Sequence, residues 1–215
     1  MRLQSSAVRS AYNRLKENYS NKDIYHLIRK TSPKLPSRYI THAIIKASTI
    51  NQEYDNIVFG GKSIFEKLSK NHLQGKQRET LKNQWKENRQ FNLISIGTGN
   101  NTEKGNLLLR FVDINGELYL RVNIKPHKWI YLNVKRQISS KKDKWIDFIF
   151  MLINAWQYEE YFPYTVEIKI IDNQIYGYVF FELPTPKYNN YKIKRSNRNR
   201  HKCKSASFSN CRSIK

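Results

Sequence analysis

Cationic and aromatic side chains recur together in this chain, and they offer the clearest chemistry that the sequence contains. Lys and Arg form charge-assisted hydrogen bonds to phosphate oxygens, and the rings of Trp and Tyr stack on nucleobases. Eleven residues of these types fall on expected loops or outward faces and are predicted to bind nucleic acid: Lys62, Arg89, Lys104, Arg110, Arg121, Lys125, Lys128, Trp129, Tyr131, Lys135 and Arg136. The alternative is ordinary surface charge for the cations and packing within a barrel for Trp129.

Acidic side chains form no comparable pattern. Asp143 and Asp147 lie four residues apart, and Glu159 and Glu160 follow, but no third carboxylate or paired histidine accompanies them. Their expected roles are helix-terminal charge and a solvated turn. The sequence contains no Gly-x-Ser-x-Gly motif for serine-based catalysis. We therefore expect no catalytic residue.

The two cysteines, Cys203 and Cys211, stand near the end of the sequence. With His201 they would supply three metal ligands, whereas structural zinc uses four, so no metal or cofactor is expected. No secretory signal pattern opens the sequence, which predicts a cytoplasmic location and reduced thiols. The longest apolar run, residues 148–153, is too short to span a bilayer, so no membrane partner is expected.

The charge balance points to a polyanionic partner. The chain of 215 residues has 39 Lys and Arg against 17 Asp and Glu, a net charge of +22. Residues 187–215 carry ten of these cations and no acid, which leaves +12 for the rest. The folded part is therefore basic in its own right, and the tail is expected to be disordered because it lacks an apolar period.

Residues 1–90 are predicted to be helical. Ala7, Ala11 and Leu15 mark one apolar face, and Pro36 suits the first turn of a later helix. Gly60 and Gly61 form a flexible turn. The last helix, over residues 76–90, is polar apart from Leu81 and Trp85, and is either solvated or laid against a nucleic-acid backbone.

Residues 91–186 are predicted to form six short antiparallel strands. Alternation over residues 118–124 and 130–134 puts aliphatic side chains on one face, and Asn115 with Gly116 predicts a type I′ turn. Residues 144–158 are apolar almost all round, which predicts a buried helix inserted between strands. The expected fold is therefore α+β: a helical region, then a small, partly closed antiparallel β-barrel of oligonucleotide-binding type with one buried helix, then the basic tail.

Several ordered features resemble one known family. They are residues 8–15, the alanines 43 and 47, the Phe-Gly-Gly-Lys of residues 59–62, and the strand block that ends at residues 176–181. In this order they resemble the N-terminal part of TnpB (OrfB) proteins, which are transposon-encoded, RNA-guided DNA nucleases related to type V CRISPR effectors. The resemblance covers roughly residues 5–183.

The resemblance implies a different role for each part of the chain. Residues 1–90 would correspond to a recognition lobe and residues 91–186 to a wedge barrel that holds guide RNA, while base pairing reads the DNA. The family's RNase H-like domain, whose three carboxylates hold divalent metal, typically Mg²⁺, is expected after residue 183, and no acid follows Glu182. The expectation is a catalytically incomplete piece, with guide-like RNA and DNA as partners and a separate nuclease polypeptide as a possible third.

Two other functions stay open at this point. One is an unrelated basic RNA-binding module of ribosomal or phage type, which would be a complete, stable fold with sequence-tolerant binding. The other is an inactive relic of a mobile element. Carboxylate-bearing strands encoded just downstream of this sequence would favour the relic or a split gene over the independent module.

Overall fold

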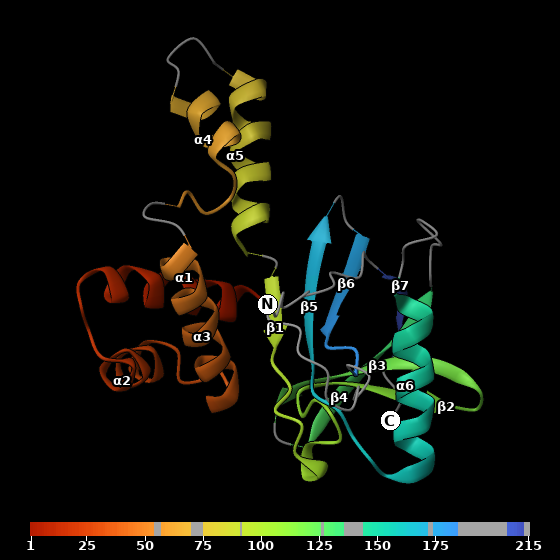
Figure 1. Cartoon of the computed structure of the whole chain (residues 1–215). Helices are drawn as coiled ribbons and strands as arrows, with labels where there is room; N and C mark the ends of the chain where they lie inside the picture. The colour runs from red at the N-terminus through yellow and green to blue at the C-terminus, as the bar shows by residue number, and fades with distance from the viewer. Residues whose placement is uncertain are drawn as a thin grey trace, which may run out of the picture. The chain divides into compact units, whose positions relative to one another are not determined.

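The computed structural model describes residues 1–53, 57–69, 75–90, 92–125, 127–135, 144–171 and 174–184, together with the backbone of 206–212. The fold is α+β, as the sequence predicts (Figure 1). It divides into two units: Met1–Ile94 with Glu167–Tyr176, and Ser95–Val166 with Gly177–Lys215. We describe each unit by itself.

The first unit begins with three packed helices, α1 (Arg2–Lys16), α2 (Asn21–Thr31) and α3 (Ser37–Glu53). Helix α2 begins where Ser20 accepts a hydrogen bond from the backbone N–H of Asp23 at 3.2 Å, so this serine is an N-cap. Alanines let the helices approach closely, since Ala11, Ala43 and Ala47 are each completely buried. The four-residue spacing in the sequence therefore predicted this core face correctly.

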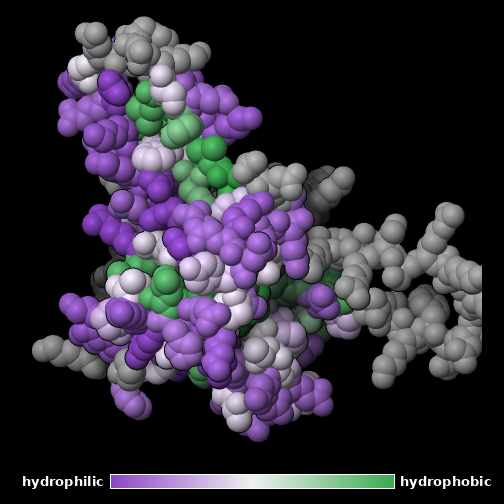
Figure 2. Space-filling model, turned by 90° about the vertical axis from the view of Figure 1, so that its left-hand side faces the viewer, coloured by the Kyte–Doolittle hydropathy of each residue, from purple (hydrophilic) through white to green (hydrophobic). Residues whose placement is uncertain are grey.

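Helices α4 (Lys62–Ser69) and α5 (Gly75–Gln90) lie side by side in the same unit (Figure 1). Their contact includes the rings of Phe65 and Trp85, whose centroids are 6.1 Å apart. Neither helix has a fully buried residue. Figure 2, which views the molecule from the left-hand side of Figure 1, accordingly shows a mainly hydrophilic surface, with apolar colour confined to narrow areas.

The side chain of Gln4 ties α1 to strand β1 (Asn92–Ser95). Its Nε2 donates to the carbonyls of Ile94 at 2.8 Å and Tyr39 at 3.2 Å, and its Oε1 accepts from the N–H of Ile94 at 2.7 Å. Ser5 accepts from the N–H of Asn92 and donates to its carbonyl. These two side chains thus satisfy strand backbone groups that a further strand would otherwise pair.

Gln4 is only 1% exposed. Its replacement by alanine is expected to lower the free energy of unfolding by about 2 kcal/mol, because three backbone groups lose the hydrogen bonds that Gln4 makes with them. Urea denaturation followed by circular dichroism measures the change. The matched control is Gln77→Ala on α5, where the glutamine is exposed. Equal stability of the two variants would contradict a structural role for Gln4.

The described residues form seven strands in the order β1-β5-β6-β7-β4-β3-β2. Besides β1 they are β2 (Leu109–Ile114), β3 (Glu117–Lys125), β4 (Lys128–Lys135), β5 (Tyr164–Ile171), β6 (Gln174–Phe181) and β7 (Ala206–Arg212). Strands β2 and β3 are joined by Asn115 and Gly116 with φ of +55° and +81°, as a type I′ turn requires.

The expected partly closed barrel is not confirmed, because the described strands form no closed barrel: β1 and β2 stand at opposite ends of the strand order. Closure was predicted partly because it removes exposed strand edges. At β1 the side chains of Gln4 and Ser5 do this instead. One edge of this sheet is therefore covered by side chains rather than removed by closure.

Helix α6 (Trp145–Tyr158) belongs to the second unit. Phe148 and Leu152 are buried, whereas Ile146 and Phe150 are 68% and 66% exposed, so the prediction of a helix buried on all sides is wrong. The helix covers its neighbours with one face only, and the apolar residues of the other face remain in solvent.

Part of the basic tail is a strand rather than disordered chain, since β7 pairs antiparallel with β4. The backbone of Cys211 lies in this strand, opposite Leu132. His201 and Cys203 lie outside the described residues, as do residues 187–200. The expected disorder of that stretch stays a prediction.

Candidate nucleic-acid interface

Strands β2, β3 and β4 have two chemically different faces. Phe111, Leu120 and Leu132 point into the core of the second unit and are at most 4% exposed. The alternate positions form the opposite face, which we call the outer face; its polar and aromatic members are Arg110, Tyr119, Arg121, Asn123, Trp129, Tyr131 and Asn133. Each of these is partly exposed. The strict alternation in the sequence correctly predicted which residues share this face.

The strand register lines up one cationic and aromatic row. Arg110 lies opposite Arg121, and Arg121 lies opposite Tyr131. The guanidinium of Arg121 also stacks on the neighbouring Trp129, 4.2 Å from the ring centroid. Four residues predicted separately from the sequence are therefore brought together on three adjacent strands.

The two arginines of this row repel each other. Burial and the nearby charge of Arg121 lower the pKa of Arg110. Like charges directly opposite each other destabilise a pair of strands. The Nε of Arg121 is buried and has no hydrogen-bond partner among the described residues. A bound anion would relieve the repulsion and could accept bonds from both guanidinium groups.

Arg110 is held in place by backbone carbonyls of the preceding loop. Its Nη2 donates to the carbonyl of Glu103 at 2.8 Å and its Nε to that of Asn106 at 3.4 Å. The Glu103 carboxylate is buried and accepts a hydrogen bond from Thr98 at 2.7 Å. The loop therefore fixes the position of the arginine through two backbone carbonyls.

The same loop positions Lys104. It ends the short 3₁₀ helix η1 (Asn101–Glu103) with φ of +47°, and its ammonium lies 5.6 Å from the ring centroid of Tyr161. Gly97 makes the loop possible, because a Cβ there would lie 2.0 Å from the carbonyl oxygen of Gly105. The backbone geometry thus explains the glycines of a segment that the sequence marks only as a loop.

Three lysines flank the outer face at strand ends. Lys125 and Lys128 are paired across the β3–β4 connection, and Lys135 ends β4; all three are exposed. Arg136, the remaining prediction in this part of the chain, lies outside the described residues. Exposed lysines at such positions can contact phosphates without being rigidly fixed.

The two predicted residues of the first unit are placed differently. Lys62 is exposed and lies 3.9 Å from Glu66, one turn further along α4, which is an ordinary surface ion pair. Arg89 stacks on Trp85 at 4.1 Å and lines a cavity together with Arg9. Sequence reasoning missed Arg9, because an arginine on the polar side of a helix carries no signal of its distant partner.

Metal ligands do not gather in the described part of the chain, where no three His, Cys, Asp or Glu side chains come together. None of the described helices has the length and apolar character needed to cross a membrane.

Fold and site together define a basic α+β protein with an arginine- and aromatic-bearing sheet face. The chain belongs to the family of the SSO2105 N-terminal domain, whose model matches residues 1–192. No curated protein and no solved structure matches it.

Proposed function

We propose that this chain binds single-stranded nucleic acid through the outer face of β2–β3–β4. The observation that carries the proposal is the Arg110–Arg121 pair with Arg121 stacked on Trp129. The arginines would contact phosphates, and Trp129 and Tyr131 would stack on the unpaired bases of a single strand. The net charge of +22 supports the same class of ligand.

Arg121→Gln is expected to weaken binding of a fluorescein-labelled single-stranded RNA about tenfold and to lower the slope of log K against log salt by about one. Trp129→Leu is expected to weaken binding by about 1–3 kcal/mol with little change in that slope, because it removes stacking rather than charge. Fluorescence anisotropy over a salt series measures both quantities.

The matched control is Lys144→Gln, which removes one charge from the same unit at a lysine 3.2 Å from Asp147. It should bind like the natural sequence apart from a small effect of net charge. If Arg121→Gln and Trp129→Leu bind no worse than this control, the outer face is not the interface.

The resemblance to TnpB proteins supports a narrower form of the proposal. In that form the strands hold a guide-like RNA as a wedge domain does, the helices act as a recognition lobe, DNA is read by base pairing, and a separate polypeptide supplies the nuclease. The chain itself would carry no catalysis and would act in the cytoplasm.

Sequencing of the RNA that copurifies with the full chain tests this narrower proposal: one discrete RNA encoded beside the gene is the expected result. A salt-sensitive mixture of cellular RNA would instead favour a general basic RNA-binding module.

A further inference from the structure

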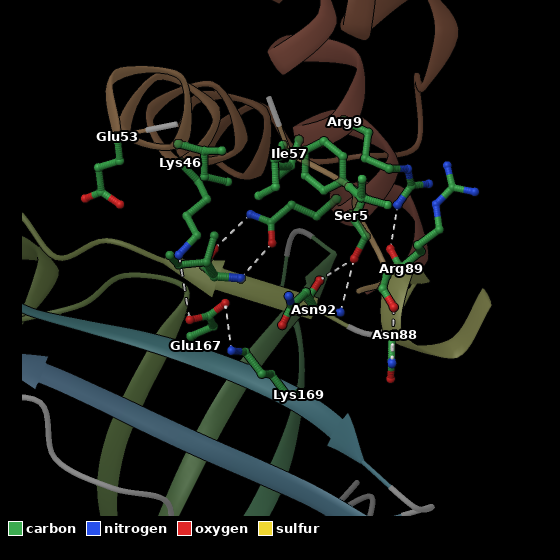
Figure 3. Close-up of a pocket in the computed structure, with 17 residues that line it drawn as sticks. Ser5, Arg9, Lys46, Glu53, Ile57, Asn88, Arg89, Asn92, Glu167 and Lys169 are labelled. Atoms are coloured by element: carbon green, nitrogen blue, oxygen red, sulfur yellow. Dashed lines mark hydrogen bonds and ion pairs between the residues drawn. The ribbon is translucent and has the colours of Figure 1, made fainter. Parts of the chain in front are cut away.

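A cavity of about 370 Å³ lies within the first unit (Figure 3). Its walls come from α1, α3, the turn before α4, the end of α5, β1 and the first-unit part of β5. This volume falls in the range that small-molecule sites occupy. The proposed function does not use the cavity.

The charges of this cavity are unevenly distributed. At one end Lys46 and Lys169 lie 3.8 Å and 3.7 Å from the carboxylate of Glu167, which is 5% exposed. At the other end the guanidinium groups of Arg9 and Arg89 lie side by side (Figure 3). Burial and the charge of Arg89 lower the pKa of Arg9. Among the described residues no carboxylate forms an ion pair with either arginine.

The lining charges sum to an excess of two positive charges. Arg9, Lys46, Arg89 and Lys169 face two carboxylates, Glu53 and Glu167. Figure 3 shows Glu53 at the lysine end, away from the arginine pair. A phosphate monoester carries a charge of about −1.5 to −2 near pH 7, and its oxygens accept hydrogen bonds from two guanidinium groups at once.

Arg89 is fixed before any ligand arrives. One face of its guanidinium stacks on Trp85 at 4.1 Å, and a Cβ on Gly60 would come within 2.6 Å of its Cγ. Gly60 also has φ of +97°, and its carbonyl accepts a hydrogen bond from Asn88. The backbone carbonyl of Arg89 in turn accepts a hydrogen bond from Arg9. The Nε of Arg89 is buried without a partner in the described structure, so a donor is left unused.

The cavity also has apolar lining that suits a nucleobase. Ile50, Ile57 and Phe59 supply apolar surface, and Phe59 is itself held edge-on by Tyr12 at 5.5 Å. Asn92 lines the same space, and its Oδ1 is buried without a partner in the described structure. Side-chain amides recognise the hydrogen-bonding edges of bases, while apolar surface accepts their faces.

We propose that this cavity binds a nucleotide with a terminal phosphate monoester, its phosphate between Arg9 and Arg89 and its base against Ile50, Ile57 and Phe59. The nucleotide is either a free nucleoside monophosphate or the phosphorylated end of a polynucleotide. The inference stands on the cavity alone and does not require the outer face of the sheet to bind.

Isothermal titration of the full chain with 5′-AMP, 5′-UMP, adenosine and inorganic phosphate tests the proposal. At least one nucleotide should bind, adenosine should bind at least tenfold more weakly than 5′-AMP, and phosphate alone should bind more weakly than the better nucleotide. Arg9→Gln and Arg89→Gln should each weaken that nucleotide at least tenfold. Lys22→Gln, an exposed lysine on α2, is the charge-matched control and should change nothing.

A 5′-phosphorylated oligonucleotide and its 5′-hydroxyl form separate the two sources of the phosphate. If the protein prefers the phosphorylated strand, Arg9→Gln abolishes this preference and 5′-AMP binds weakly, the ligand is a polynucleotide end. If 5′-AMP binds tightly and the protein does not prefer the phosphorylated strand, the ligand is a free nucleotide. Arg121→Gln should leave this preference intact, which keeps the test independent of the outer face. The inference is overturned if neither ligand binds, or if binding is unchanged in Arg9→Gln and in a folded Arg89→Gln.

Discussion

Replacement of Phe148 by alanine is expected to lower the free energy of unfolding of the second unit by about 3–5 kcal/mol. Phe148 is completely buried at the centre of α6. Its ring centroid lies 5.2–5.8 Å from those of five other aromatic residues, namely Phe111, Trp145, Phe162, Tyr164 and Phe181. Truncation would leave a cavity bordered by large, rigid rings that relax poorly around it.

Thermal unfolding followed by circular dichroism measures this loss, which corresponds to a decrease in Tm of about 6–20 °C for a protein of this size. Phe150→Ala is the matched control, because Phe150 lies on the same helix but is 66% exposed. Its effect should stay within about 0.5 kcal/mol. Similar losses for both variants would show that the outward face of α6 is buried in solution.

Replacement of Asn106 by leucine is expected to cost at least about 3 kcal/mol, because the amide of this side chain makes five hydrogen bonds that hold the loop before β2. Its Oδ1 accepts hydrogen bonds from Ser95 Oγ and from the N–H groups of Leu108 and Leu109, and its Nδ2 donates to the carbonyls of Ser95 and Tyr164. Asn106 is completely buried. Leucine has similar size but removes all five of these hydrogen bonds, although the carbonyl of Tyr164 keeps another donor, the N–H of Gly97.

Urea denaturation measures the loss, with Asn100→Ala as the control. Asn100 caps η1 through one bond to the N–H of Thr102 at 3.2 Å, so its removal should cost only about 0.5–1 kcal/mol. The Asn106 variant should also lose part of its affinity for RNA, since Arg110 donates to the carbonyl of this residue. A stable Asn106→Leu protein would refute the role assigned to the amide.

The tyrosine beside Asn106 shows how strongly this core excludes water. Burial raises the pKa of Tyr164 to about 12, although a bond from the N–H of Phe111 to its oxygen and the charge of Arg110 act in the opposite direction. The phenol therefore stays neutral across the physiological range. Its ring also packs against Phe148, so the two stabilising features of the second unit are in contact.

Local patterns in the sequence predicted much of this fold. Alternation along β3 and β4 identified the outer face, and Asn115 with Gly116 identified the turn, because both follow from backbone geometry over a few residues. Helical spacing identified the buried alanines of α1 and α3. These properties depend on near neighbours in the chain.

Other features depend on distant residues and were not predictable. Gln4 contacts a strand 90 residues further along, so nothing local showed that it would cover the edge of β1. The partial exposure of α6 depends on which face its neighbours cover, whereas apolar composition alone predicted burial all round. Arg9 and Arg89 come close to each other only in the folded first unit. The Gly60 turn was predicted, but not that it would hold the side chain of Arg89.

The division of the chain into units has a consequence for the order of its synthesis. The first unit takes up Glu167–Tyr176, so 72 residues of the second unit are translated between Ile94 and the segment that completes the first. At about 5–20 residues per second this delay is roughly 4–14 s. Lys46 leaves the ribosome long before Glu167, its partner in the cavity. The cavity of the first unit is thus finished only after residues 95–166 have been translated, although its first helices are the earliest part of the chain to be made.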